Sequence, residues 1–263
     1  MKIVVCVKHV PDAQGDRRFT DDHTVDREGV DGLLSELDEY AVEEALTIAE
    51  ARSASGEDST VTVLCMGPEG ATDAVRKALQ MGADAGVHVC DDALAGSDAL
   101  ATSKVLAAAL RTLEFDLVLT GMASTDGLMS VVPAMLAQRL GLPQVTLAGK
   151  VELDGTTVRI ERDGDSATEV IEAPLPALVS VTDQINDPRY PSFKGIMAAK
   201  KKPVNTLSLA DLGLSPDDVG LSAAWSVVEA VAARPPRQAG QRITDEGDGG
   251  TRLVEFLAGA KIV

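Results

Sequence analysis

Short apolar runs alternate with amphipathic segments along the first half of the chain. Four runs are rich in aliphatic residues, as expected of strands buried on both faces of a parallel sheet, at 2–7, 59–66, 87–90 and 117–119. Three segments place apolar side chains at helical spacing, at 36–51, 70–79 and 100–113. This order predicts a doubly wound α/β domain with right-handed crossovers and helices on both faces of the sheet.

The stretch from Asp116 to Thr146 carries the clearest candidate for a binding site. A small, polar loop at 121–127 follows the fourth strand. A helix is then predicted from apolar residues at helical spacing, namely Leu128, Val131, Val132, Met135, Leu136 and Leu140, with Pro133 in its first turns. Backbone N–H groups at a helix start attract phosphate, and ligands of parallel sheets lie at the carboxyl ends of strands. The loop is therefore a candidate nucleotide site, with a solvated turn as the alternative.

Residues 8–34, between the first strand and the first helix, are polar and are expected to form a long loop, with a small hairpin at 19–25. Ser35 is a suitable N-cap for the helix that follows. Asp38, three residues later, comes close to a capping box.

The pattern changes after Pro143. Residues 150–153 and 157–161 alternate around Asp154-Gly155, which predicts a hairpin, and 168–171 pairs back before a last apolar strand at 175–181. From Leu207 the chain is irregular, with a linker at 233–237 and an amphipathic helix at 251–258.

The segment 186–203 combines an apolar group with a basic run. Phe193, Ile196 and Met197 have helical spacing beside the lysines at 200–202. A short surface helix with solvated lysines and an exposed docking loop with an apolar anchor both fit this pattern.

Composition narrows the possible functions. The chain has 263 residues, of which only 3% are aromatic, and a net charge of −17. This charge argues against a general nucleic-acid binder or a surface held to anionic lipid.

The sequence contains no 18-residue apolar run, and charged residues occur early at its start. We therefore expect neither a signal peptide nor a membrane span, and we expect a cytoplasmic location. The three cysteines and three histidines lack metal-ligand spacing, so no metal is expected. Asp126 has no His or Lys beside it in its motif, so we assign it to binding or capping and predict no catalytic residue.

Three blocks together resemble the beta subunit of electron transfer flavoprotein. They are MKIVVCVKHVPD with SELDEYAVEEAL, then GMASTDGLMSVVPAMLAQRLGLPQVT, and VRIERDGDSATEVIEAPLPALVSVTDQINDPRYPSFKGIMAAKKKP. The resemblance reaches the tail GDGGTRLVEFLA and so covers nearly the whole chain. It implies a Rossmann-like, adenine nucleotide alpha hydrolase-like α/β fold with a mostly parallel sheet and an added β-hairpin region. It also implies a domain at 1–233 that includes a recognition loop at 186–203, and a C-terminal arm at 234–263 that packs on the alpha subunit.

The resemblance implies an electron carrier without catalytic residues of its own. In this family the alpha subunit of a heterodimer holds FAD, and in the common electron carriers the beta subunit holds a buried AMP that serves structure. The pair carries electrons from acyl-CoA and related dehydrogenases, as in fatty acid oxidation, to a membrane quinone oxidoreductase. The flavin supplies the redox chemistry, and the protein sets its position and potential.

By position, the resemblance assigns the nucleotide contacts to three parts of this chain. These are Cys6, Ser35, Glu36, Leu37, Asp38 and Met66, and the run Gly121, Met122, Ala123, Ser124, Thr125, Asp126, Gly127, Leu128, Met129, Ser130, Val131 and Val132. Ser130 to Val132 replace a more polar Asn-Gln-Thr end, which leaves phosphate binding more to backbone N–H groups.

The resemblance also assigns residues that bind partners. Phe193 matches an anchoring Leu of the recognition loop, which enters a pocket on the dehydrogenase, and Ile196 and Met197 lie beside it. Asp163 matches an acid that pairs with an arginine of the alpha subunit.

Two alternatives stay open. In electron-bifurcating relatives the beta site holds a second FAD and the complex also binds NAD(H), so it oxidises NADH. The other alternative is a stand-alone nucleotide-binding α/β domain. Flavin stoichiometry separates the carrier from the bifurcating type, and solubility without a partner tests the third hypothesis.

Overall fold

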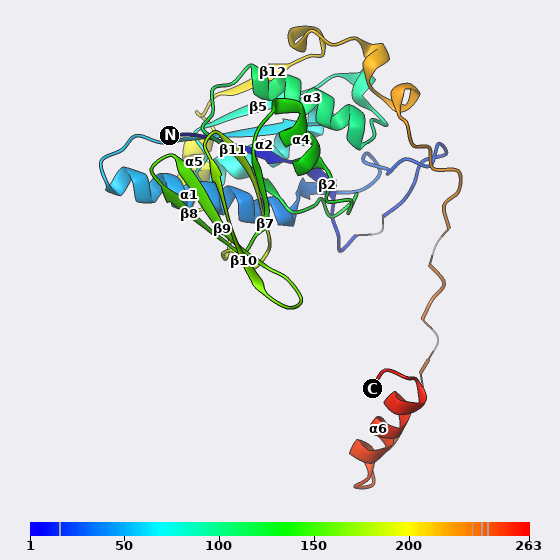
Figure 1. Ribbon diagram of the computed structural model, residues 1–263. Coiled ribbons are helices and arrows are strands. Elements are labelled where there is room, and N and C mark those ends of the chain that lie inside the picture. The colour runs from blue at the N-terminus through cyan, green and yellow to red at the C-terminus, as the bar shows by residue number, and fades with distance from the viewer. Residues whose placement is uncertain (16, 233, 238, 241) are drawn as a thin grey trace. The chain divides into compact units, whose positions relative to one another are not determined.

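The computed structural model describes residues 1–15, 17–232, 234–237, 239–240 and 242–263. Its centre is a seven-stranded sheet in which every pair of neighbours is parallel (Figure 1). The strands, in their order across the sheet, are β12 (Val204–Leu207), β5 (Ala85–Val89), β4 (Thr60–Met66), β1 (Lys2–Val7), β6 (Leu117–Gly121), β11 (Ala177–Val181) and β7 (Gln144–Ala148).

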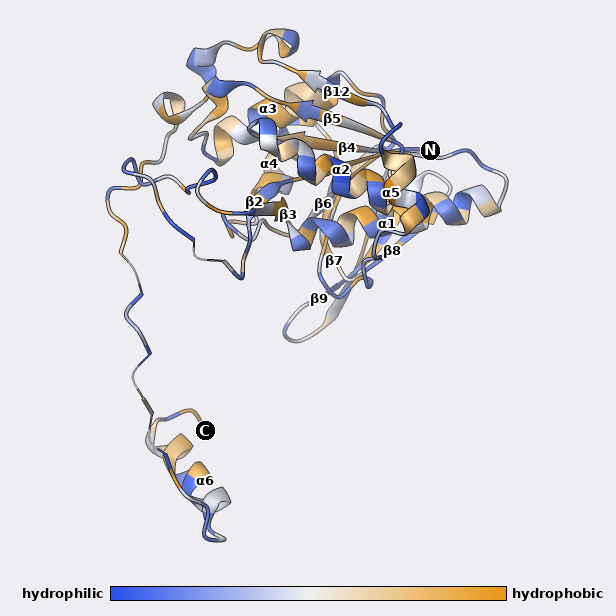
Figure 2. Cartoon of the chain, turned by 180° about the vertical axis from the view of Figure 1, so that it is seen from behind, coloured by the Kyte–Doolittle hydropathy of each residue, from blue (hydrophilic) through white to orange (hydrophobic). Residues whose placement is uncertain are grey.

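Alternate residues of the strands enter two separate core layers. Ile3 and Val5 of β1 pack with α1 (Glu36–Ala54) and α2 (Thr72–Met81). Val4, from the same strand, packs with α3 (Ala99–Arg111) and α4 (Val132–Leu140). Both faces of the sheet are thus covered, and the strands appear as hydrophobic bands in Figure 2. The predicted doubly wound α/β fold is confirmed.

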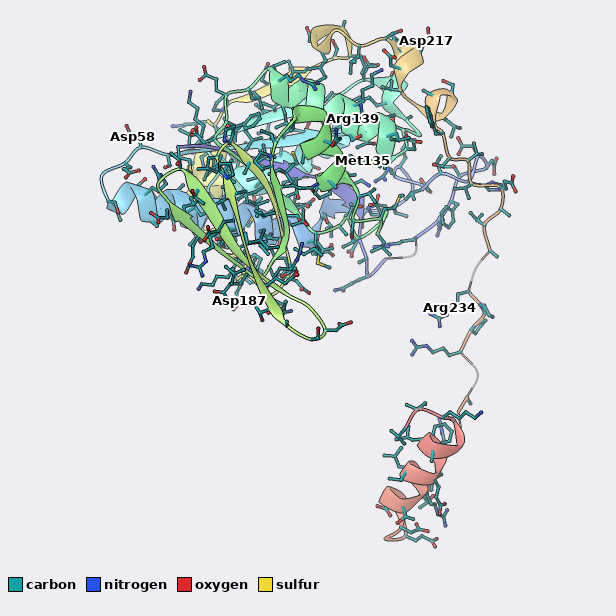
Figure 3. All side chains as sticks on the ribbon, in the orientation of Figure 1. Asp58, Met135, Arg139, Asp187, Asp217 and Arg234 are labelled. Carbon is teal, nitrogen blue, oxygen red and sulfur yellow. The ribbon has the colours of Figure 1, made fainter. Side chains whose placement is uncertain are left out.

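Side-chain bonds join the two helices on the second face. Arg139 of α4, labelled in Figure 3, donates from Nε to the Ser103 hydroxyl at 2.9 Å and from Nη2 to the Leu100 carbonyl at 3.1 Å. Both acceptors belong to α3. These bonds hold α4, and with it the loop that leads into α4, at a fixed place on the sheet.

The antiparallel region after β7 also follows the prediction. The strands β8 (Lys150–Asp154), β9 (Thr157–Asp163) and β10 (Thr168–Pro174) form a three-stranded sheet beyond β7 (Figure 1). Gly155, with φ at 57°, makes the first turn. Val158 and Ile160 of β9 are buried in the core layer that contains α1 and α2.

Several short strands were missed. Residues 8–34 include β2 (His9–Pro11) and β3 (Gly32–Leu34), an antiparallel pair of three residues each, where only a loop was expected. The expected hairpin at 19–25 appears as a single bridge between Phe19 and Val25. Residue 16 of this segment is outside the described residues. The strands β7 and β12 were not predicted either.

The predicted start of the fourth helix was wrong. The structure begins α4 at Val132, so Leu128 and Val131 precede it. Leu128 and Ser130 have φ values of 54° and 56°, in the left-handed region, which interrupts a right-handed helix. Pro133 lies in the first turn as expected, and Gly141, with φ at 68°, ends the helix.

Two α-helices occur among the described residues after β11. The first, α5 (Phe193–Ala199), confirms the helical spacing at residues 193–197. Between β12 and residue 230 the chain forms short 3₁₀ turns at Ala210–Leu212, Pro216–Asp218 and Leu221–Ala223. Two further 3₁₀ turns lie earlier in the chain, at Glu69–Ala71 and Asp92–Leu94.

The chain divides into two compact units, Met1–Glu229 and Ala230–Val263. The second unit contains α6 (Gly249–Gly259), the amphipathic helix expected at the C-terminus, with Leu253, Val254 and Phe256 exposed. The predicted domain boundary and linker involve residue 233, which is outside the described residues. None of the described helices is long and apolar enough to span a bilayer.

We expect Val179→Ala to lower the free energy of unfolding by about 2 kcal/mol, because Val179 is fully buried in β11 and its replacement leaves a cavity. Val170→Ala on β10 is the matched control, since Val170 is 52% exposed and should change stability by less than about 0.5 kcal/mol. Urea denaturation of both variants measures the difference. Equal losses would contradict the assignment of β11 to the core.

Candidate nucleotide site

The sheet reverses its winding between β1 and β6. From β1 the chain builds outward through β4 and β5, then returns to place β6 on the other side of β1. The carboxyl ends of β4, β1 and β6 are therefore neighbours, and they carry Met66, Cys6 and Gly121. In open parallel sheets, ligands bind at the carboxyl ends of strands where the winding reverses. The fold thus brings together the three predicted groups of site residues.

The end of β6 lies directly against the first turn of α1. A Cβ atom at Gly121 would lie 2.6 Å from both the Leu37 carbonyl oxygen and Asp38 Oδ1. Only glycine allows this approach, since real Cβ contacts are longer. The contact brings the first turn of α1, at Ser35, Glu36, Leu37 and Asp38, next to Gly121. The two segments are roughly eighty residues apart in the sequence.

The expected capping box at Ser35 does not form. Ser35 occupies the N-cap position, but its buried hydroxyl has no partner among the described residues, and Asp38 turns away from it. Asp38 Oδ2 instead accepts the Lys8 backbone N–H at 2.8 Å, while Asp38 Oδ1 lies close to Gly121 at the end of β6. Burial raises the pKa of Asp38 to about 7, although the Lys8 N–H and the charge of Lys8 act in the opposite direction.

Asp126 is the centre of an ion-paired cluster. Its side chain is 2% exposed, and its two oxygens lie 2.8 Å from Lys8 Nζ and 2.5 Å from Arg27 Nη2. Burial by itself would raise the pKa of Asp126, but Lys8, Ser124 and Arg27 outweigh it and hold that pKa well below its usual range. The capping role proposed for Asp126 is wrong, because α4 begins at Val132 and has no side-chain cap.

Three cations around this loop escaped prediction from sequence. Lys8 and Arg27 lie 118 and 99 residues from Asp126 in the chain. Arg17 Nη1 donates to the Thr125 carbonyl at 2.6 Å. Lys8, directly after β1, and the segment 17–27 thereby supply positive charge beside the loop after β6. No local sequence pattern links residues so far apart, although basic residues stand out in a chain with a net charge of −17.

The loop from Met122 to Val131 presents backbone donors. The N–H groups of Met129, Ser130, Val131 and Val132 donate to no acceptor among the described residues. Leu128 and Met129 have exposed side chains, while Met122, Ala123 and Thr125 are half-buried. A run of free N–H groups at the start of a helix is suited to bind an anion.

Buried hydroxyls line the same region. Ser35, Thr120 and Thr125 each have a buried hydroxyl oxygen without a partner in the described structure, as does one oxygen of Glu36. Buried polar atoms are nearly always hydrogen-bonded, so this concentration indicates a ligand or ordered water. Cys6 is buried, which raises the pKa of its thiol to about 12 and leaves it unreactive, and Met66 packs against the core layer that contains Cys6.

The predicted partner-binding residues lie elsewhere. Phe193 is 80% exposed at the start of α5, where the Ser192 hydroxyl accepts the Gly195 N–H at 3.0 Å, and Ile196 and Met197 are partly exposed beside it. Asp163 ends β9 and accepts the Thr168 hydroxyl at 2.6 Å. Among the described residues, no group of three or more His, Cys, Asp and Glu side chains could hold a metal.

Comparison with known proteins agrees with this architecture. Residues 22–212 match the family described as "Electron transfer flavoprotein domain". An electron transfer flavoprotein subunit beta of Mycobacterium tuberculosis is 51% identical over 263 residues, 99% of each chain. The chain belongs to the electron transfer flavoprotein beta-subunit family. A Megasphaera elsdenii electron transfer flavoprotein subunit beta is 34% identical over the full length of both chains.

Family membership establishes a role in electron transfer as part of a flavoprotein. The subunit name also implies an alpha-subunit partner. Another relative is the CarD subunit of a caffeyl-CoA reductase-Etf complex from Acetobacterium woodii, which is 36% identical over 245 residues, 93% of this chain and 92% of CarD.

We expect Gly121→Ala to lower both bound nucleotide and stability, the latter by about 1–3 kcal/mol, because the new Cβ would force β6 away from α1. Gly70→Ala is the control, since a Cβ there meets nothing within 4 Å. Nucleotide content after denaturation and thermal unfolding measure the two effects. A Gly121→Ala protein with full nucleotide content would show that this contact does not shape the site.

We expect the charge of Asp38 to destabilise the fold as the pH rises. Its pKa is about 7 in the folded protein and about 4 when unfolded, so the folded state binds more protons between these values. Stability relative to Asp38→Asn should therefore fall from pH 4 to pH 7 and level off above pH 7. Urea denaturation of both proteins across this range tests the sign, and a relative stability that rises with pH would contradict it.

Proposed function

We propose that this chain is the beta subunit of an electron carrier that holds a structural AMP, while FAD belongs mainly to its alpha partner. The observation that carries the proposal is that the N–H groups of Met129 to Val132 have no acceptor among the described residues and lie close in sequence to Asp126 and its paired cations. The heterodimer would carry electrons from acyl-CoA and related dehydrogenases to a membrane quinone oxidoreductase.

The charges at the site support a phosphate ligand. The chain as a whole carries −17, yet Lys8, Arg17 and Arg27 gather at one loop. Asp126 compensates only part of this positive charge. N–H donors and incompletely compensated cations together favour an anionic group such as a phosphate.

The neutral part of the site suits an adenosine. Cys6 and Met66 provide apolar surface at the ends of β1 and β4, and the hydroxyls of Ser35, Thr120 and Thr125 offer donors and acceptors. A ligand bound only by the folded state would add a few kcal/mol of stability near saturation, by about RT ln(1 + [L]/Kd). AMP in this position would stabilise the join between β1, β6 and α1.

Exposed apolar residues support a large partner subunit. Trp225 is 88% exposed, and Val227 and Val228 are exposed beside it. The helix α6 in the second unit has hydrophobic as well as polar residues on its surface (Figure 2). Such surfaces are typical of protein interfaces, and we assign them to the alpha subunit.

CarD gives specific support to a second candidate. It is named as part of a caffeyl-CoA reductase-Etf complex, and this chain aligns with nearly all of it. In that candidate the beta site holds a second FAD and the complex uses NAD(H).

The ligand experiment separates the two candidates. We expect the heterodimer purified with its alpha subunit to release AMP and FAD in equal amounts on denaturation, and Lys8→Met to lower AMP content by about tenfold through the lost charge. Lys201→Met is the control, because Lys201 is exposed on another part of the chain. Two FAD and no AMP per heterodimer would establish the second candidate instead.

We expect Phe193→Ala to slow reduction of the flavin by an acyl-CoA dehydrogenase by about tenfold or more at limiting carrier, since one aromatic anchor can supply most of the affinity. Folding, AMP content and direct reduction by dithionite should stay unchanged. Val170→Ala, which also truncates an exposed apolar side chain, should transfer electrons normally. Normal transfer by folded Phe193→Ala would exclude the anchor role.

A further inference from the structure

Arg189 joins the segment before α5 to two carboxylates of α1. Its Nε and Nη2 lie 2.8 Å and 2.9 Å from the two oxygens of Glu43, and its backbone N–H donates to Glu43 at 3.0 Å. Its Nη1 and Nη2 lie 2.5 Å and 3.1 Å from the oxygens of Glu50. One guanidinium thus binds two carboxylates that are separated by about two helical turns of α1.

The environment of this cluster makes it stronger than a solvated ion pair. The Glu43 side chain is 11% exposed and that of Arg189 is 32% exposed, so water screens their attraction only in part. The hydrogen bonds that its guanidinium donates to Glu50 and Glu43 raise the pKa of Arg189 further above its ordinary value. The paired, two-oxygen contact with Glu43 also fixes the direction of the guanidinium, which a lysine ammonium could not do.

A second side chain holds the same segment three residues earlier. Asn186 Nδ2 donates to the Tyr40 carbonyl at 3.1 Å and to Glu44 at 3.3 Å. Asp187, labelled in Figure 3, lies in sequence between this contact and Arg189. Residues 186–189 are therefore bound along one side of α1.

The far end of the segment is held by α2. A Cβ at Gly195 would lie 2.5 Å from the Gln80 carbonyl oxygen, so α5 rests directly on the last turn of α2. Lys202 Nζ donates to the Leu79 and Gly82 carbonyls, each at 3.0 Å, which satisfies acceptors at the end of α2. Lys202 is thus a structural residue, unlike a solvated surface lysine.

The backbone is held at both ends while its large side chains face solvent. Tyr190 is 92% exposed and Phe193 is 80% exposed. We propose that Arg189 is a positioning residue: with Glu43 and Glu50 it fixes residues 186–202 in their docking conformation before a dehydrogenase arrives. This inference rests on the proposed docking role of Phe193. A segment that is ordered in advance loses less conformational freedom on binding and so binds more tightly.

The test compares variants of the full heterodimer. We expect Arg189→Gln to speed amide hydrogen exchange at residues 190–199 by about tenfold and to weaken binding of an acyl-CoA dehydrogenase by about tenfold, the scale set by the ordering of a few side chains. Glu50→Gln should produce a smaller change in the same direction, since Glu50 is 61% exposed and its loss leaves the Glu43 pair intact. Arg159→Gln on β9, which removes an exposed ion pair with Glu172, should change neither quantity.

A double-mutant cycle separates positioning from general stability. In a Phe193→Ala background, Arg189→Gln should have little further effect on affinity, because the side chain that it positions is gone. An equal affinity loss in both backgrounds, or exchange and affinity that are unchanged in folded Arg189→Gln, would overturn the positioning role. If Phe193→Ala alone leaves affinity unchanged, the docking proposal fails instead, and faster exchange in Arg189→Gln would still show that Arg189 orders the segment.

Discussion

The close approach of Gly121 to the first turn of α1 is the constraint on which the candidate site depends. It requires a residue without Cβ at the end of β6, and it places Gly121 beside Asp38, which accepts the Lys8 backbone N–H. Three segments from distant parts of the sequence meet there, namely the residue after β1, the first turn of α1 and the end of β6. Because β1 and β6 are neighbours at the reversal of the sheet, the same contact defines one wall of the space where a ligand can bind.

The two aspartates of the site illustrate how surroundings decide the behaviour of one functional group. Asp126 is buried but faces Lys8 and Arg27, so it stays ionised and ties the segment 17–27 to the loop after β6. Asp38 is buried with backbone donors and a more distant charge, so its pKa rises toward neutrality. Desolvation acts on both, and only the direct ion pairs at Asp126 are strong enough to reverse its effect.

The periodicity of apolar residues predicted the elements that are defined by burial, and it missed the features that depend on single contacts. The aliphatic runs of β1, β4, β6 and β11 gave the correct fold class, because a strand covered on both faces must be apolar throughout. The same reasoning placed the start of α4 too early, because the left-handed backbone at Leu128 and Ser130 does not change the spacing of apolar residues. Strands as short as β2 and β3 show no periodicity, and the pairing of Lys8 with Asp126 depends on sheet topology.

The central position of β1 has a consequence for the synthesis of the chain. The first strand to leave the ribosome has its two neighbours at residues 60–66 and 117–121, and β11 completes that side of the sheet only at Val181. Parallel pairing over such separations is slow to form, and an apolar strand without neighbours can associate with other chains. At least the first 121 residues must therefore be translated before β1 can pair with both of its neighbours, and until then its apolar side chains are open to association with other nascent chains.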